Sequence, residues 1–209
     1  MSAVIDDNER LHTPGSAVEQ AGESVPNRDL RQRDLVPPEK LRELTITVVG
    51  VGAIGRQLAI QLAAMGVSRL ELIDPDMVEA VNLAPQGYFE ADLGRPKVEA
   101  TAALCKQLNP AVSIVSQCER FRRSQSVGDV IFMAVDRIDT RRLIWETAND
   151  SARFIADGRM SGETLRVLGV ADEIGRDHYP TTLFQQSEAH GGPCTGRSTL
   201  YAATIAAGL

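Results

Sequence analysis

The chain has 209 residues, of which 43% are hydrophobic, so it suits one α/β domain and leaves too little sequence for a second full domain. Its net charge of −6 and pI near 5.1 argue against a nucleic-acid-binding protein that depends on a basic surface. No apolar run approaches the roughly 18 residues of a membrane span. Three widely separated cysteines form neither a disulfide framework nor a four-thiolate zinc site. We expect a cytoplasmic protein that binds no nucleic acid and no membrane.

The N-terminal part of the chain divides near residue 27. Residues 1–27 are polar and lack hydrophobic periodicity, which predicts a disordered tail. Residues 28–44 show a short helical pattern that Pro37 and Pro38 break and that resumes at Glu39. We expect the globular domain to run from residue 28 to Leu209.

A strand at 45–49 leads directly into a glycine-rich turn. Gly50, Gly52 and Gly55 stand at the G-x-G-x-x-G spacing after an apolar, β-branched run. The first glycine permits a tight turn, the second lets the backbone approach a phosphate, and the third lets the next helix pack closely on the strand. In this context the spacing predicts a nucleotide site.

A helix at 53–65 and a second strand at 69–74 complete this unit. The helix would direct its unpaired N–H groups at a bound anion. Asp74 lies 19 residues beyond Gly55, where an acid can accept hydrogen bonds from both ribose hydroxyls. Because Asp74 would repel a 2′-phosphate, the unit favours ATP or NAD over NADP.

A long loop at 75–94 separates this unit from the remaining elements, and loops of that length are usually functional. Helices and strands then alternate, which predicts an α/β fold with a Rossmann-like, doubly wound, mostly parallel sheet and an antiparallel extension formed by the last strands. The elements expected after the loop are a helix at 95–108, strands at 112–119 and 129–135, a helix at 139–149, strands at 153–157 and 164–171, a loop-rich segment at 178–198, and a final helix from Leu200. That helix has no stop signal, so we expect the natural protein to continue beyond Leu209.

An ordered series of short motifs follows the nucleotide unit. They are Asp74-Pro75-Asp76, Asn82-Leu83, the D-x-G-x-x-K run from Asp92 to Lys97, Leu108-Asn109-Pro110, and Asp136 to Arg141 where a D-N-x-x-x-R segment would stand. Over roughly residues 28–209 this succession resembles the ThiF/MoeB/HesA family, relatives of the ubiquitin-activating enzymes. The ordered series is much more specific than the glycine turn alone.

The resemblance implies an adenylyltransferase that uses ATP and Mg²⁺. Such enzymes join AMP to the C-terminal carboxylate of a ubiquitin-like or sulfur-carrier protein, usually ending in Gly-Gly. That carboxylate is already ionised, so the reaction needs cations and a metal rather than a general base. By resemblance Lys97 contacts the triphosphate, Asp136 holds the magnesium ion, and Asn82 and Gln86 contact the nucleotide.

Several of these residues also have plain structural interpretations. Lys97 could be a solvated helix residue, and Asp136 could cap the helix at 139–149. Asp139 is better explained as that helix cap than as a metal ligand. Asp76 could cap a helix or brace its loop.

Arg31-Gln32 matches an N-terminal R-Q pair of the dimeric bacterial members. In those proteins the arginine reaches the phosphate site of the partner subunit, so the resemblance implies a homodimer. The alternative is a surface helix whose arginines are solvated.

Two features of the family are missing. The loop that usually reads N-L-x-R-Q has Pro85 in place of a phosphate-contacting arginine, and Arg95 is a candidate substitute. The paired C-x-x-C zinc motifs are also absent, and Gln185, Gln186 and His190 occupy that stretch, so we predict no structural zinc. The proline leaves open a nucleotide-binding scaffold or sensor with weakened catalysis. An NAD-dependent oxidoreductase is a further alternative, but it gives Lys97, Asp136 and Arg31 no shared purpose.

Cys194 lies in a P-C-T segment similar to one in which some relatives keep a thioester-forming cysteine. Arg197 and a nearby helix N-terminus would favour its thiolate, although an incidental thiol is an alternative. We expect Cys105 and Cys118 to be core residues. Arg159 lies near the expected tail channel, either pairing with an acid or exposed in a hairpin turn.

Overall fold

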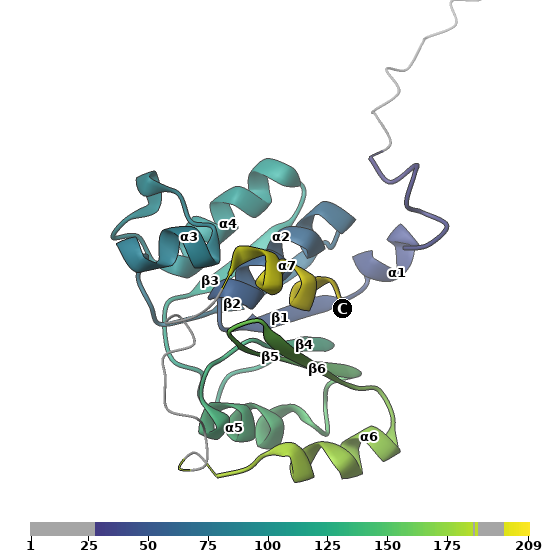
Figure 1. Ribbon diagram of the computed structural model, residues 1–209. Coiled ribbons are helices and arrows are strands. Elements are labelled where there is room, and N and C mark those ends of the chain that lie inside the picture. Colours follow the sequence, from purple (N-terminus) through teal and green to yellow (C-terminus); the bar gives the residue numbers. More distant parts are fainter. Residues whose placement is uncertain (1–27, 186, 188–198) are drawn as a thin grey trace, which may run out of the picture.

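A six-stranded sheet in the order β3-β2-β1-β4-β5-β6 forms the centre of the molecule (Figure 1). This computed structural model describes residues 28–185, 187 and 199–209. All strand pairings are parallel except the antiparallel pair β5–β6, which confirms the predicted fold. The strands are β1 (Thr45–Val49), β2 (Arg69–Ile73), β3 (Ser113–Gln117), β4 (Val130–Met133), β5 (Phe154–Ser161) and β6 (Thr164–Val170).

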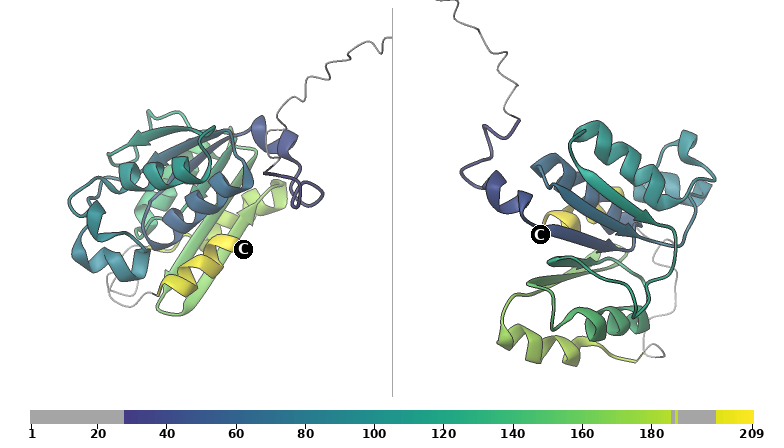
Figure 2. Two further views of the ribbon diagram at one scale, coloured as in Figure 1. Left: turned by 90° about the horizontal axis from the view of Figure 1, so that it is seen from above. Right: turned by 180° about the vertical axis from the view of Figure 1, so that it is seen from behind.

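Helices cover both faces of this sheet. Figures 1 and 2 show α2 (Ala53–Met65), α4 (Lys97–Leu108) and α7 (Leu200–Gly208) on one face, with α5 (Ile138–Ala148) and α6 (Glu173–His178) on the other. The shorter segments are α1 (Pro38–Arg42), η1 (Ala80–Asn82), α3 (Leu83–Gln86), η2 (Glu90–Asp92) and η3 (Tyr179–Thr182). None of these helices combines the length and apolar character needed to cross a membrane.

Successive side chains of β1 point alternately into the two hydrophobic clusters, one on each face of the sheet. Ile46 and Val48 are buried in the cluster that includes α2 and α4, whereas Val49 packs in the cluster that includes α5. Successive side chains of a strand point to opposite faces, so a run of apolar residues in a central strand serves both layers. Thr47 is the polar exception, and its hydroxyl donates to Glu71 Oε2 at 2.6 Å.

Two local predictions were wrong, and one helix was not predicted. Residues 28–36 form hydrogen-bonded turns rather than helix, with the N–H groups of Gln32 and Arg33 donating to Asp29 O. The segment at 75–94 contains three short helical pieces instead of being an open loop. We missed α6, which has only six residues and is capped by the carboxylate of Asp172.

The turn between β1 and α2 is held by very close backbone contacts. Gly50 has φ of +89°, a conformation that favours glycine, and a Cβ at this position would lie 2.5 Å from Ala134 O. A Cβ on Gly55 would lie 1.8 Å from Gly50 O. The predicted roles of these two glycines in the turn and in helix packing are therefore visible in the structure.

Gly55→Ala is expected to lower the free energy of unfolding by about 3 kcal/mol or more, because the new methyl group overlaps backbone that has no room to move. Urea denaturation followed by circular dichroism measures this. Gly208→Ala in α7 is the control, since its Cβ would make only an ordinary contact of 3.8 Å with Gln61 Oε1. Equal stability of Gly55→Ala and wild type would contradict the packing role.

Candidate nucleotide site

A cavity of about 540 Å³ lies at the carboxyl ends of β1, β2 and β4. In the sheet, β2 and β3 lie on one side of β1, and β4 to β6 lie on the other, so the strand order reverses at β1. Open α/β sheets bind ligands at such switch points. The predicted site residues that line this cavity are Gly50, Gly52, Asp74, Gln86, Lys97 and Asp136.

Gly52 faces open space in the cavity. A Cβ at this position would have Gln86 Oε1, 4.0 Å away, as its nearest neighbour. Gly52 is the N-cap of α2, and no side chain of the described residues caps this helix. The unpaired N–H groups of the first turn therefore remain available to an anion.

Asp74 is a buried carboxylate that braces the glycine turn. One of its oxygens accepts the Val51 N–H at 2.6 Å, and the other accepts the Asp76 N–H at 2.8 Å. Burial raises the pKa of Asp74, and these two hydrogen bonds and the charge of Lys97 oppose that increase. Each carboxylate oxygen has a second lone pair, so the predicted contact with a ribose remains open.

Lys97 is the first residue of α4 and is almost completely buried. Its Nζ lies 3.0 Å from Asp76 Oδ2, and the side chain is 7% exposed, against 62% for Asp76. The backbone N–H of Lys97 also donates to Asp76 O. Asp76 therefore braces its loop against α4 and orients the ammonium group at the cavity wall.

Gln86 has an unsatisfied polar atom. Its Oε1 is buried and has no hydrogen-bond partner within the described part of the chain. Buried amide oxygens are nearly always paired in folded proteins, so an orphan that faces a cavity indicates a missing donor. A ribose hydroxyl or a base amino group of a nucleotide fits that requirement.

Asn82 lies behind this wall and does not line the cavity. Its Oδ1 accepts the Glu79 N–H at 2.9 Å, as half of a capping box at the start of η1. The side chain is buried, so the observed geometry supports a role in bracing the loop.

Asp136 is exposed in the short connection from β4 to α5. The cap of α5 is Arg137, without a side-chain hydrogen bond, so the helix-cap interpretations of Asp136 and Asp139 were both wrong. Within the described residues no group of three or more His, Cys, Asp or Glu could hold a metal. One carboxylate still suffices for Mg²⁺ when phosphates and water supply the other ligands.

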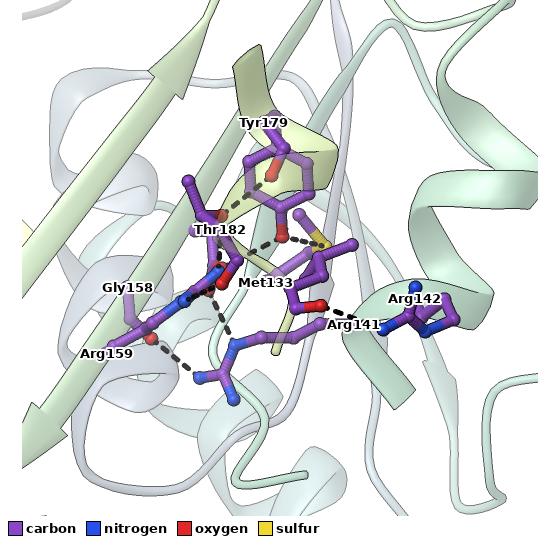
Figure 3. A network of polar contacts seen from close by, with 9 residues as sticks. Met133, Arg141, Arg142, Gly158, Arg159, Tyr179 and Thr182 are labelled. Carbon is purple, nitrogen blue, oxygen red and sulfur yellow. Dashed lines mark hydrogen bonds and ion pairs between the residues drawn. The ribbon is translucent and has the colours of Figure 1, made fainter. Parts of the chain in front are cut away.

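A buried ionic network borders the cavity (Figure 3). Asp157 is fully buried and lies 2.8 Å from Arg141 Nε and 2.7 Å from Arg159 Nε. Tyr179 donates its hydroxyl to the same carboxylate at 2.9 Å, and burial, followed by the charge of Asp157, raises the pKa of Tyr179. Arg141 lines the cavity, so the network connects its wall to β5 and η3.

Arg159 corrects one sequence-based interpretation. It lies within β5 rather than in an exposed hairpin turn, and it pairs with an acid, Asp157. Its guanidinium also donates to the carbonyl and hydroxyl of Thr182.

The profile of the ThiF family matches residues 27–183. The chain belongs to the ThiF family.

Curated relatives of this ThiF-family chain are longer proteins. The adenylyltransferase and sulfurtransferase MOCS3 of Sus scrofa is 34% identical over 175 residues, which cover 78% of this chain and 35% of the relative. The SAMP-activating enzyme E1 of Haloferax volcanii is 37% identical over 153 residues, covering 69% of this chain and 55% of the relative. The chain thus spans about a third of one relative and about half of the other.

Solved structures share the fold of this ThiF-family chain. Escherichia coli MccB crystallised with ATP has a TM-score of 0.61 and 20% identity, covering 90% of this chain and 63% of MccB. PaaA has a TM-score of 0.69 and 20% identity, covering 98% of this chain and 66% of PaaA.

The structure does not place Arg31 in its own cavity. The turns around it dock at the C-terminal end of α2, where Arg28 donates to Ala64 O at 3.1 Å and Gln32 donates to Met65 O at 3.0 Å. The cavity lies at the opposite end of the same helix, which is about 20 Å long. Arg31 itself is exposed and does not line the cavity.

The cysteines separate into different environments. Cys105 is buried as predicted, but Cys118 is exposed just beyond the end of edge strand β3, with its thiol directed at Pro75 O. Cys194, Gln186 and His190 lie outside the described residues.

Asp157→Asn is expected to lower the free energy of unfolding by about 3 kcal/mol or more. The substitution leaves two largely buried guanidinium groups without a counter-charge, and breaking a buried pair in this way is strongly destabilising. Glu146→Gln, in the exposed pair with Arg123, is the control and should cost less than about 1 kcal/mol. Chemical denaturation compares them, and similar effects of both variants would contradict the network's importance.

Burial raises the pKa of the Cys105 thiol to about 11, so this thiol should stay protonated and unreactive at pH 8. Iodoacetamide at that pH is expected to label exposed Cys118 and to label Cys105 only after unfolding in guanidinium. Peptide mass mapping measures both sites. Native-state labelling of Cys105 as fast as that of Cys118 would rule out this packing.

Proposed function

We propose that this ThiF-family domain adenylylates the C-terminal carboxylate of a ubiquitin-like or sulfur-carrier protein. The observation that supports this best is the cavity that brings Gly52, the uncapped start of α2, Lys97, Asp136 and the unsatisfied Gln86 together. The relatives, an adenylyltransferase and sulfurtransferase and a SAMP-activating enzyme, support the same reaction.

ATP is the proposed co-substrate. The carboxylate of the carrier protein attacks the α-phosphate, its new bond to phosphorus forms, and the bond to the β-phosphate breaks to release pyrophosphate. No proton has to move, so the site must mainly position two anions and stabilise developing charge. Lys97 and the first-turn N–H groups of α2 would bind phosphate oxygens in this arrangement.

Asp136 is the proposed magnesium ligand. Its exposed carboxylate lines the cavity, where it could share the ion with bound phosphates. Mg²⁺ would neutralise phosphate charge and favour departure of pyrophosphate.

We further propose a cytoplasmic homodimer in which Arg31 of one copy reaches the phosphate site of the other. The support is the separation between exposed Arg31 and the cavity of its own chain. The carrier would present a flexible C-terminus ending in Gly-Gly, because only a thin tail fits such a site beside a nucleotide.

A scaffold or sensor that binds ATP without adenylylation is the second candidate, and Pro85 is the observation that favours it. The oxidoreductase alternative has no comparable support, since the named relatives carry out activation or adenylyl transfer. ATP-dependent pyrophosphate exchange with the carrier protein distinguishes the enzyme from the scaffold.

ATP·Mg²⁺ is expected to raise the melting temperature of wild type, and the shift should fall sharply in Asp136→Ala. A ligand at about 100 times its dissociation constant stabilises by roughly 2.7 kcal/mol, which a thermal-shift assay resolves. Glu146→Ala is the control, because this exposed acid of α5 does not line the cavity and is paired with Arg123 instead. Stabilisation by NAD but not by ATP would refute the proposed function.

A further inference from the structure

Among the described residues, four cationic side chains line the cavity, and two of them already have a carboxylate partner within 3.0 Å. Lys97 is paired with Asp76 at 3.0 Å, and Arg141 is buried against Asp157 at 2.8 Å. The other two cations that line it are Arg120 and Arg137.

Arg137 has only a weak partner. Its NH2 group lies 3.4 Å from Asp139 Oδ2, and these side chains are 56% and 58% exposed. An exposed ion pair of this kind contributes little to stability, so the guanidinium can exchange Asp139 for a stronger anion at little cost. Phosphate is such an anion, because it accepts two parallel hydrogen bonds from the planar guanidinium.

The loop that leads to Gln86 brings no cation to the cavity. The loop before Gln86 reads Asn82-Leu83-Ala84-Pro85 and contains no basic residue. Arg95 does not fill this gap, because it pairs with Asp92 at 2.8 Å and does not line the cavity. A nucleoside triphosphate would therefore meet no cation from the Pro85 loop.

Arg137 is better placed than Arg120 for this role. It lies in a connection of four residues between β4 and α5, bounded by buried Met133 and Ile138. Arg120 lies in the much longer connection between β3 and β4, where no contact fixes its side chain among the described residues. A side chain on a short, anchored connection is held closer to its productive position.

We propose that Arg137 binds the phosphates of ATP and supplies the cation that the Pro85 loop lacks. This inference rests on the proposed function and adds a substrate-contacting residue to it. Arg137 follows Asp136 directly, so one short segment would contribute both the metal ligand and the phosphate cation. Its contact with Asp139 is replaced when the nucleotide enters.

The test compares Arg137→Ala and Arg137→Lys with two control variants. Arg120→Ala removes the other lining cation that has no carboxylate partner within 3.0 Å among the described residues, and Arg123→Ala removes an arginine that does not line the cavity. Isothermal titration calorimetry measures affinity for ATP·Mg²⁺ and for adenosine, and pyrophosphate exchange measures turnover. Melting temperatures without nucleotide verify that each variant is folded.

Arg137→Ala is expected to weaken ATP·Mg²⁺ at least about tenfold and to slow exchange by about a hundredfold, while adenosine affinity stays unchanged. Arg137→Lys should fall between Arg137→Ala and wild type, since it keeps the charge without the bidentate geometry. Both control variants should remain within about threefold of wild type.

The possible failures are distinguishable. Wild type that binds ATP while Arg137→Ala binds it equally well would overturn the role of Arg137 and leave the proposed function intact. A loss confined to Arg120→Ala would assign the cation to Arg120 and also overturn the inference. Wild type that fails to bind ATP would refute the proposed function, and the inference with it.

Discussion

The buried carboxylate of Asp74 is the contact on which the site depends. Its hydrogen bond to Val51 fixes the middle of the glycine turn, and its bond to the Asp76 N–H fixes the loop that leaves β2. Asp76 in turn holds Lys97 at the start of α4. Asp74 therefore connects the glycine turn to the loop after β2 directly, and it connects both to the start of α4 through Asp76. All of these contacts are 3.0 Å or shorter. Its burial is tolerated because both oxygens accept hydrogen bonds and a cation lies nearby.

A second buried group, Arg56, holds the wall that carries Gln86. Its guanidinium is 0% exposed, donates twice to Gly87 O, and lies 4.1 Å from the centre of the Tyr88 ring. Burial lowers the pKa of Arg56, although nearby Tyr88 opposes that shift. The Tyr88 hydroxyl donates to Val51 O at 2.7 Å. This hydrogen bond connects the segment after Gln86 to the glycine turn. Gln86 is thus held in place by its neighbours rather than by a hydrogen bond of its own side-chain oxygen.

Features that depend on residues close together in the sequence could be predicted, and features that depend on tertiary contacts could not. The turn at Gly50 and the strand and helix around it follow from spacing within a few residues, and the parallel order of strands follows from their alternation with helices. The pairing of Arg141 with Asp157 joins residues 16 positions apart through the tertiary fold, and no local pattern marks it. The contacts of Arg56 with Gly87 and Tyr88 are likewise tertiary, and no local pattern marks them. Cys118 was misplaced because β3 is an edge strand, where alternation does not reveal which side chains are covered.

The two sides of the cavity differ in how firmly their charges are held. Lys97 and Asp74 are buried and hydrogen-bonded, so that side is organised before any ligand enters. Asp136 and Arg137 are exposed on the opposite side and have rotamer freedom that binding must remove. Groups of the first kind suit the parts of a nucleotide that stay in place during a reaction. Under the proposed function, groups of the second kind would suit a metal ion and the phosphates released as pyrophosphate, since release requires contacts that break easily.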